Sequence, residues 1–320
     1  MPDWTKSQSR PTRISLLLFD RFSNLCLANC IEPLRAANSL RAQTAFSWSI
    51  LTLDGAGCRS SSDIEVLPEA SLARMAPVDY LFVLASYAHD RHDTAPVRRA
   101  LRAASARAET IVALDAGPWL MASAGLLDGR RATVHWDLLN AFTERFLSVE
   151  AERARIVRDG NLITCAGAMS ALDLTLDLIS SHLGTAARLD VAALFLHGDP
   201  PISRAPGDPP ADPLVARALE LMRDSLESPL TVPALARRLS CQPRTLDRRF
   251  RARLGAAPGT VYRHLRLAEA RKLIEDTRMG LAEIAVRCGY DSPAALSRAV
   301  ARQYGAGPRV LRRGPATGAR

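Results

Sequence analysis

The chain has 320 residues, of which 48% are hydrophobic and 23% are charged. This composition excludes a chain that is disordered throughout, and the length is sufficient for two domains that each bury a core. The formal net charge of +9 is unevenly distributed, because residues 1–200 sum to −2 and residues 211–320 sum to +11. A near-neutral half followed by a strongly basic one is typical of a nucleic-acid-binding domain joined to a domain of another function.

No segment of the sequence has the features of a secretion signal or a membrane span. The first twelve residues are polar, and no apolar run approaches the ~18 residues that a spanning helix needs. The six cysteines are scattered, which indicates reduced thiols rather than a disulfide framework. Cys26 and Cys30 could share a helix face, but no nearby histidine or second cysteine pair completes a metal site. We therefore expect a cytoplasmic protein that binds neither a metal nor a membrane.

Short apolar runs alternate with amphipathic stretches over the first 200 residues. The apolar runs predict strands at 14–19, 48–53, 80–85, 110–114 and 162–165. The amphipathic stretches predict helices at 25–40, 96–108, 117–125, 168–183 and 185–196. Strands that alternate with helices form parallel βαβ units, so we expect an α/β domain with a doubly wound, flavodoxin-like parallel sheet.

The segment 199–213 is rich in proline, which removes a backbone donor and disfavours helix in the preceding residue. We interpret residues 199–212 as a linker between a first domain at 13–198 and an all-α domain at 213–314. Residues 1–12 are expected to be disordered, and residues 315–320 to form a tail.

The second domain contains an internal repeat. Leu246, Arg248, Gly255 and Pro258 recur, in the same order, fifty residues later as Leu296, Arg298, Gly305 and Pro308. The upstream pair Leu235–Ala236 recurs forty-nine residues later as Ile284–Ala285. The difference predicts one extra residue between the two helices of the second copy. A repeat of this kind predicts two helix-turn-helix units.

Each copy predicts a helix that is apolar on one face and basic on the other. In the first copy, Leu246, Phe250 and Leu254 share one face, and the opposite face carries Arg244, Asp247, Arg248 and Arg251. In the second copy, Leu296, Val300 and Tyr304 face inward and Arg298 outward. Such a helix suits the major groove of DNA, where arginine pairs with guanine or phosphate. A lone basic helix is usually only a solvated face, but the repetition favours DNA.

Residues 213–312 resemble the DNA-binding domain of AraC/XylS-type transcriptional regulators, through TVPALARRLSCQPRTLDRRFRARLGAAP and GLAEIAVRCGYDSPAALSRAVARQYGAGP. The resemblance implies two helix-turn-helix units on one long helix, which enter successive major grooves about 34 Å apart. It also implies a homodimer that works with RNA polymerase. The implied DNA contacts are Arg244, Thr245, Asp247 and Arg248 in the first unit and Ser297 and Arg298 in the second. Ala294, Ala295 and Ala301 leave the second helix fewer polar groups with which to read sequence.

The first domain resembles the class I glutamine amidotransferase-like (PfpI-type) domain of a regulator subfamily that senses arginine or choline-derived quaternary amines. The matching segments are IEPLRAAN, WSILTLDG, SAGLLDGRRATVHW and TCAGAMSALDLTLDLI. Enzymes of that superfamily carry a cysteine nucleophile at a strand-to-helix elbow, paired with a histidine. Here the elbow reads LDAGPWLMA and places Asp115 at that position, so His135 has no thiol to activate. The stretch LFVLASYAHD also lacks the Gly-Gly that shapes an oxyanion site. We expect no catalytic residues and no cofactor.

A fold without its nucleophile can keep a ligand pocket. In a doubly wound sheet, ligands bind beyond the carboxyl ends of the strands, where Asp115, Ser86–Tyr87 and His135–Trp136 are expected to converge. Asp115 would pair with a cationic ligand, and Tyr87, Trp119 or Trp136 would offer cation–π faces. The alternatives are that Asp115 caps the following helix and that each tryptophan packs in the core.

The charge distribution, the repeat and the two resemblances together predict a regulator that responds to a small nitrogenous metabolite. By analogy with the family, it is expected to activate an amine or amino-acid catabolism operon. Two alternatives stay open at this point. One is a PfpI-type hydrolase fused to a DNA-binding domain, and the other is an architectural DNA binder that needs no ligand.

Overall fold

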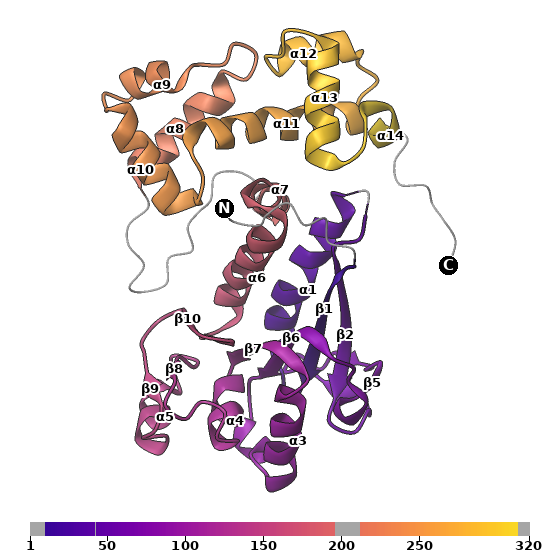
Figure 1. Cartoon of the computed structure of the whole chain (residues 1–320), viewed down its shortest axis with the longest axis vertical. Coiled ribbons are helices and arrows are strands. Elements are labelled where there is room, and N and C mark those ends of the chain that lie inside the picture. The colour runs from indigo at the N-terminus through magenta and orange to yellow at the C-terminus, as the bar shows by residue number, and fades with distance from the viewer. Residues whose placement is uncertain (1–9, 42, 196–211, 313–320) are drawn as a thin grey trace. The chain divides into compact units, whose positions relative to one another are not determined.

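The computed structural model of the chain describes residues 10–41, 43–195 and 212–312. Most of the predicted linker (199–212), the first nine residues and the predicted tail lie outside these ranges. The chain divides into two compact units (Figure 1). Unit 1 comprises 1–38 and 44–178, and unit 2 comprises 39–43 and 179–320. None of the described helices is both long and apolar enough to cross a lipid bilayer.

Unit 1 is built on a seven-stranded sheet with the order β10-β11-β7-β6-β1-β2-β5. Every pairing in this sheet is parallel except that of β10 with β11. The strands are β1 (Thr12–Leu18), β2 (Phe46–Thr52), β5 (Ala70–Ser71), β6 (Val78–Ala85), β7 (Ala108–Asp115), β10 (Ile156–Asp159) and β11 (Leu162–Cys165). The doubly wound α/β prediction is confirmed, and the five predicted strands are β1, β2, β6, β7 and β11. The two additional strands of this sheet lack the apolar run by which the others were predicted, since β5 has only two residues and β10 reads IVRD.

Both faces of the central strands are covered. Leu81 and Val83 of β6 pack in a core with α3 and α4, while the alternate residues Phe82 and Leu84 are equally buried on the opposite face. The helices that lie wholly or mainly in unit 1 are α1 (Asn24–Ser39), α2 (His89–His92), α3 (Ala95–Ser105), α4 (Gly117–Ser123), α5 (Leu139–Arg145) and α6 (Ala168–Leu183), with a 3-10 turn at Leu72–Arg74. The last residues of α1 and α6 fall in unit 2. Two small ribbons complete it, β3 (Cys58–Arg59) with β4 (Glu65–Val66) and β8 (Arg131–Ala132) with β9 (Glu150–Ala151).

All secondary-structure elements in the described part of unit 2 are helices. Its helices are α7 (Thr185–Phe195), α8 (Pro213–Asp224), α9 (Val232–Arg238), α10 (Pro243–Leu254), α11 (Pro258–Asp276), α12 (Leu281–Arg287), α13 (Pro293–Tyr304) and α14 (Pro308–Arg312). Two separate apolar cores, one around Leu246 and Phe250 and one around Leu296 and Val300, lie on the two halves of α11. Two helix-turn-helix units on one long helix are therefore confirmed (Figure 1).

The repeat is visible in the backbone of unit 2. Gly255 and Gly305 end α10 and α13 in the left-handed conformation, with φ of 67° and 71°. Glycine has no Cβ to clash there, which explains why it recurs at both ends. The connection from α12 to α13 is one residue longer than that from α9 to α10, as the sequence offsets predict.

Candidate ligand site and nucleic-acid interface

The strand-to-helix elbow at Asp115 is a constrained backbone segment of unit 1. Asp115 ends β7 with φ of 62°, a left-handed conformation that is uncommon outside glycine and that aspartate tolerates better than most residues. Two residues on, α4 begins at Gly117, where a Cβ atom would lie 2.3 Å from the carbonyl oxygen of Val83. Only glycine allows α4 to start this close to β6. The elbow geometry is thus present, with a carboxylate at its apex.

Three segments meet at the Asp115 side chain. Ser86, at the end of the neighbouring strand β6, donates a hydrogen bond to the carboxylate and accepts one from the Ser23 amide at 2.9 Å. The His135 amide donates to the Asp115 carbonyl oxygen at 3.0 Å. Burial raises the pKa of the Asp115 carboxyl, and the Ser86 hydroxyl, His135 and His89 oppose that rise only in part. The Asp115 carboxylate is therefore partly removed from water, and its neighbours only partly offset the free-energy cost of keeping it ionised.

Asp115 does not cap the helix that follows it. The N-cap residue of α4 is Ala116, and no side-chain hydrogen bond caps the helix. The capping alternative therefore does not account for the Asp115 side chain, which is directed to Ser86 instead.

The three aromatic candidates differ in their surroundings. Tyr87 and Trp136 are 62% and 73% exposed, and the Trp136 ring lies 5.3 Å from that of His135. Trp119 is half-buried, with ring centroids 4.9 Å from His89 and 5.2 Å from Phe146. Core packing describes Trp119, whereas Tyr87 and Trp136 keep exposed aromatic faces.

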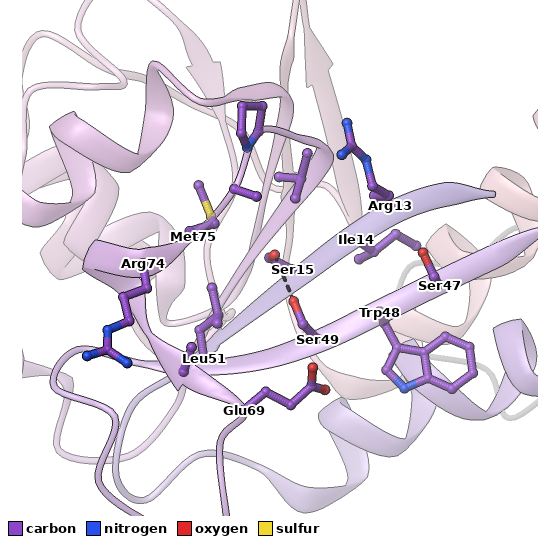
Figure 2. Close-up of a pocket in the computed structure, with 14 residues that line it drawn as sticks. Arg13, Ile14, Ser15, Ser47, Trp48, Ser49, Leu51, Glu69, Arg74 and Met75 are labelled. Carbon is purple, nitrogen blue, oxygen red and sulfur yellow. Dashed lines mark hydrogen bonds between the residues drawn. The ribbon is translucent and has the colours of Figure 1, made fainter. Parts of the chain in front are cut away.

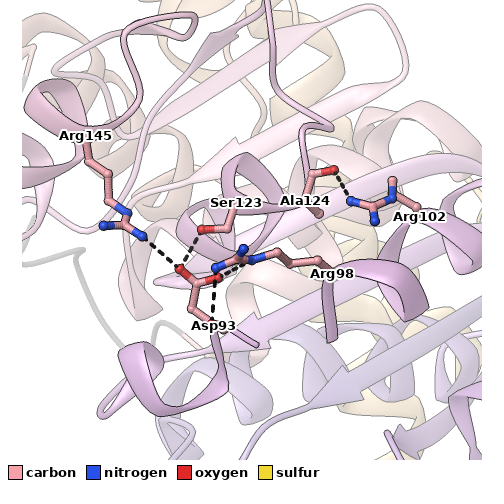
Figure 3. A network of polar contacts seen from close by, with 6 residues as sticks. All are labelled: Asp93, Arg98, Arg102, Ser123, Ala124 and Arg145. Atoms are coloured by element: carbon pink, nitrogen blue, oxygen red, sulfur yellow. Dashed lines mark hydrogen bonds and ion pairs between the residues drawn. The ribbon is translucent and has the colours of Figure 1, made fainter. Parts of the chain in front are cut away.

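A polar network braces α4 from behind (Figure 3). The Asp93 carboxylate accepts hydrogen bonds from Arg98 at 2.7 Å and from Ser123 of α4 at 2.8 Å, and it pairs with Arg145 of α5 at 3.5 Å. Burial by itself would raise the pKa of Asp93, but these partners outweigh it and lower the pKa. The Cζ atom of Arg145 also lies 5.8 Å from the centroid of the Trp119 ring. The network therefore holds both α4 and the side chain of Trp119, which α4 carries, in place.

Sequence reasoning placed neither His89 nor the thiols of Cys26 and Cys165 beside the elbow, although it expected the cysteines to be buried. His89 lies just beyond the end of β6, where its pKa is lowered by burial, and its place after a strand end could have revealed it. Cys26 and Cys165 are fully buried, and the electrostatics of both thiols include Asp115. No local pattern signals them, since α1 and β11 bring them together only in the fold. A hydrogen bond with Cys30 and burial raise the pKa of Cys26, and burial raises that of Cys165, which keeps both thiols protonated and weakly nucleophilic.

A separate cavity of about 340 Å³ lies along β1 and β2 and is open to solvent (Figure 2). Its centre holds the hydroxyls of Ser15 and Ser49, which are 3.0 Å apart and hydrogen-bonded to each other. None of the residues that converge on Asp115 lines it. Its central hydroxyls bond to each other, and its lining also includes the charged residues Arg13, Glu69 and Arg74.

The first predicted recognition helix, α10, presents two exposed arginines for which the described part of the chain shows no ion pair. Leu246 and Phe250 are fully buried, whereas Arg244 and Arg248 are exposed. Asp247 is half-buried and pairs with Arg251 at 2.8 Å, and Thr245 is also half-buried. Arg249 is directed away, because it pairs at 2.9 Å with Asp212, the N-cap residue of α8.

The second predicted recognition helix, α13, is less polar. Leu296, Val300 and Tyr304 are buried, and Arg298 is exposed, as the sequence predicts. The Ser297 hydroxyl donates to the backbone carbonyl of Pro293 at 2.8 Å, so its hydrogen atom is already used within the helix.

Comparisons with known proteins agree with both halves. The sequence model of the DJ-1/PfpI family matches residues 12–181, and that of a helix-turn-helix domain matches residues 235–314. The HTH-type transcriptional regulator CdhR of Pseudomonas aeruginosa is 31% identical over 91% of this chain and 89% of its own. GlxA of Rhizobium meliloti, an HTH-type transcriptional regulator, is 33% identical over 94% of this chain and 95% of its own. A crystal structure of a ThiJ/PfpI family protein from Pseudomonas syringae shares the fold, with a TM-score of 0.54, 23% identity, and 70% of this chain and 91% of its own covered.

A DJ-1/PfpI domain followed by an AraC-type helix-turn-helix domain defines a class of DNA-binding transcription regulators. The chain belongs to the DJ-1/PfpI family and, through relatives matched over most of their length, to the HTH-type transcriptional regulators. The two resemblances identified from the sequence are confirmed.

Proposed function

We propose that the protein is a ligand-responsive regulator whose first unit binds a small organic cation at Asp115 and whose second unit binds operator DNA. The observation that carries this proposal is the strained elbow at Asp115, kept although no nucleophile stands there. Backbone strain persists where the surrounding structure enforces it, and it gathers at functional sites. The proposal gives this strain a use, which is to present a carboxylate to a ligand.

The charge balance at the elbow favours a cation. The groups that stabilise the ionised Asp115 are one hydroxyl and two histidines, and its pKa nonetheless stays raised. A bound cation would supply the missing charge, and the exposed rings of Tyr87 and Trp136 would offer cation–π contacts. Quaternary ammonium and guanidinium groups share this chemistry, which fits the two effector classes that the resemblance implies.

Binding without turnover fits this elbow better than hydrolysis. Asp115 lacks the thiolate of the related enzymes, and the nearby thiols of Cys26 and Cys165 are held in the protonated form. Neither is a replacement nucleophile. An amidase or glyoxalase-like turnover that disappears in His135→Ala would favour the alternative, a hydrolase fused to a DNA-binding domain.

The ligand proposal is tested by thermal unfolding of the full chain with tetramethylammonium, glycine betaine and arginine. We expect at least one of these compounds, each of which carries a cationic ammonium or guanidinium group, to raise the Tm, and Asp115→Asn to abolish the increase. Asparagine is the suitable replacement, because it tolerates the left-handed backbone and removes only the charge. The matched control is Asp90→Asn, an exposed carboxyl on the neighbouring helix α2, which should leave the response intact.

Two results would contradict the ligand proposal. One is that no cation in a broad metabolite panel shifts the Tm, which would favour an architectural DNA binder. The other is that Asp115→Asn responds as the unsubstituted protein does.

The resemblance further implies a homodimer that activates RNA polymerase. Sedimentation of the full chain tests the homodimer, and in vitro transcription tests the activation.

A further inference from the structure

The connection between α12 and α13 is tied to the long helix α11. The Arg266 guanidinium of α11 donates through Nε to the Cys288 carbonyl oxygen at 2.7 Å and through Nη2 to the Gly289 carbonyl oxygen. Its Cζ atom also lies 4.4 Å from the centroid of the Tyr290 ring. One arginine therefore holds three consecutive residues of the turn that precedes the second recognition helix.

The same turn touches the first helix-turn-helix unit. Gly289 has φ of 66°, and a Cβ atom there would lie 2.4 Å from Cγ of Pro229 and 2.6 Å from the Leu226 carbonyl oxygen. Leu226 and Pro229 belong to the connection between α8 and α9. Such an approach requires glycine, so the backbones of the two units meet directly at this point.

A tyrosine on α11 holds the other side of this contact. The Tyr262 hydroxyl donates to the Ser225 carbonyl oxygen at 2.8 Å and accepts from the Leu230 amide at 3.2 Å, both on the α8–α9 connection. Tyr262 and Arg266 are four residues apart and so lie on the same face of α11. Adjacent side chains of one helix thus fasten the two connections that meet at Gly289.

We propose that Tyr262, Arg266 and Gly289 are positioning residues that fix the separation of α10 and α13 and so restrict the operator to one spacing between its two major-groove boxes. Each helix-turn-helix unit has its own apolar core, and besides these contacts the two are joined by α11 and by α7, whose Leu189 packs against the first core and whose Asp190 accepts hydrogen bonds from Gln303 and Tyr304 of α13. One inserted base pair moves the second box by about 3.4 Å and rotates it by about 35°. If α10 and α13 are held at a fixed separation, the second helix can no longer contact its box after such an insertion. If the two helix-turn-helix units can move relative to each other, the second helix can still reach the displaced box. This inference depends on DNA binding by both units and not on the ligand.

The test is selection of binding sites by the full chain from random duplexes about four helical turns long. We expect the unsubstituted protein to select two boxes at one spacing. Arg266→Met, which keeps the stem but loses the donors, should select the same two boxes at several adjacent spacings. Pro229→Ala, which relaxes the contact at Gly289 and leaves the hydrogen bonds of Tyr262 intact, should do the same to a smaller extent.

The matched control is Arg263→Met, which removes the same charge from an exposed position of α11 one turn earlier. It should weaken binding at most and keep the single spacing. The spacing distribution is a readout that a merely structural role would not move, because a destabilised protein binds less DNA without accepting new spacings. The proposal is overturned if Arg266→Met and Pro229→Ala both keep the single spacing, or if the unsubstituted protein selects several spacings or one box only.

Discussion

At the scale of the residue, the elbow carries Asp115 where the related enzymes carry a cysteine nucleophile, and we propose that it binds a cation. The position and the left-handed backbone are those of a nucleophile, but a carboxylate whose pKa stays raised, with a hydroxyl and two histidines but no arginine or lysine among its stabilising partners, is suited to attract a positive charge. The sequence predicted the position, because the elbow follows a strand and precedes Gly117. It did not predict the left-handed backbone or that the buried thiols of Cys26 and Cys165 lie beside Asp115, which depends on how β7 meets α1 and β11.

The raised pKa predicts a pH dependence of cation binding. A cation favours the ionised form of Asp115, so affinity is fully developed above the pKa of the free protein and falls as the pH drops through it. Since burial raises that pKa above the ordinary 3.8, the loss should begin at a higher pH than for an exposed aspartate. Calorimetric titrations between pH 8 and pH 4 measure it (about a tenfold loss per pH unit below the pKa is the limit for one proton).

Protonation of the neighbouring histidines would repel a cation in the same direction, so the carboxyl must be separated from them. His135→Gln should keep most of the loss of affinity at low pH, whereas Asp115→Asn should bind weakly at every pH. A pH profile that is the same in the unsubstituted protein and in Asp115→Asn would contradict the assignment of the binding charge to Asp115.

At the scale of the element, the repeat in unit 2 gave the sequence analysis its firmest support. The structure shows the two helix-turn-helix units that the repeat predicts, with a glycine at the end of each second helix. It also shows that the turn of the second unit is one residue longer than that of the first. The contacts of Arg266 and Gly289 could not be predicted, because they join segments that only tertiary packing brings together. In unit 1 the strands β5 and β10 were missed for a different reason, since β5 has only two residues and β10 reads IVRD, in which two charged residues follow two apolar ones.

The exposed arginines of α10 predict unequal contributions to DNA binding. Arg248→Ala should weaken binding to the selected operator by about 1–3 kcal/mol, because an exposed arginine on this face reads a base edge or a phosphate. Arg249→Ala removes the same charge from the same helix, but Arg249 is held by Asp212, so it should cost less binding. Fluorescence anisotropy titrations of both variants measure the difference. Equal losses would show that α10 contributes only its general charge.

At the scale of the whole molecule, the net charge of +9 describes neither unit. It combines a first part at −2, to which we assign the proposed cation site, with a second part at +11 that carries the helix-turn-helix units. A ligand regulates such a protein only if it binds the DNA-bound and free forms with different affinity, and the coupling must then be reciprocal. DNA should therefore change the affinity for the cation by the same factor by which the cation changes the affinity for DNA.

The most direct measurement of this account is the affinity of the full chain for its selected operator with and without the cation that raises its Tm. We expect the cation to change the Kd for DNA by a factor of roughly 5–150, the usual range of coupling between sites. We also expect Asp115→Asn to bind the same DNA with a Kd that the cation does not change. A cation that binds the unsubstituted protein and leaves its Kd for DNA unchanged, or that shifts the Kd of Asp115→Asn equally, would contradict the account.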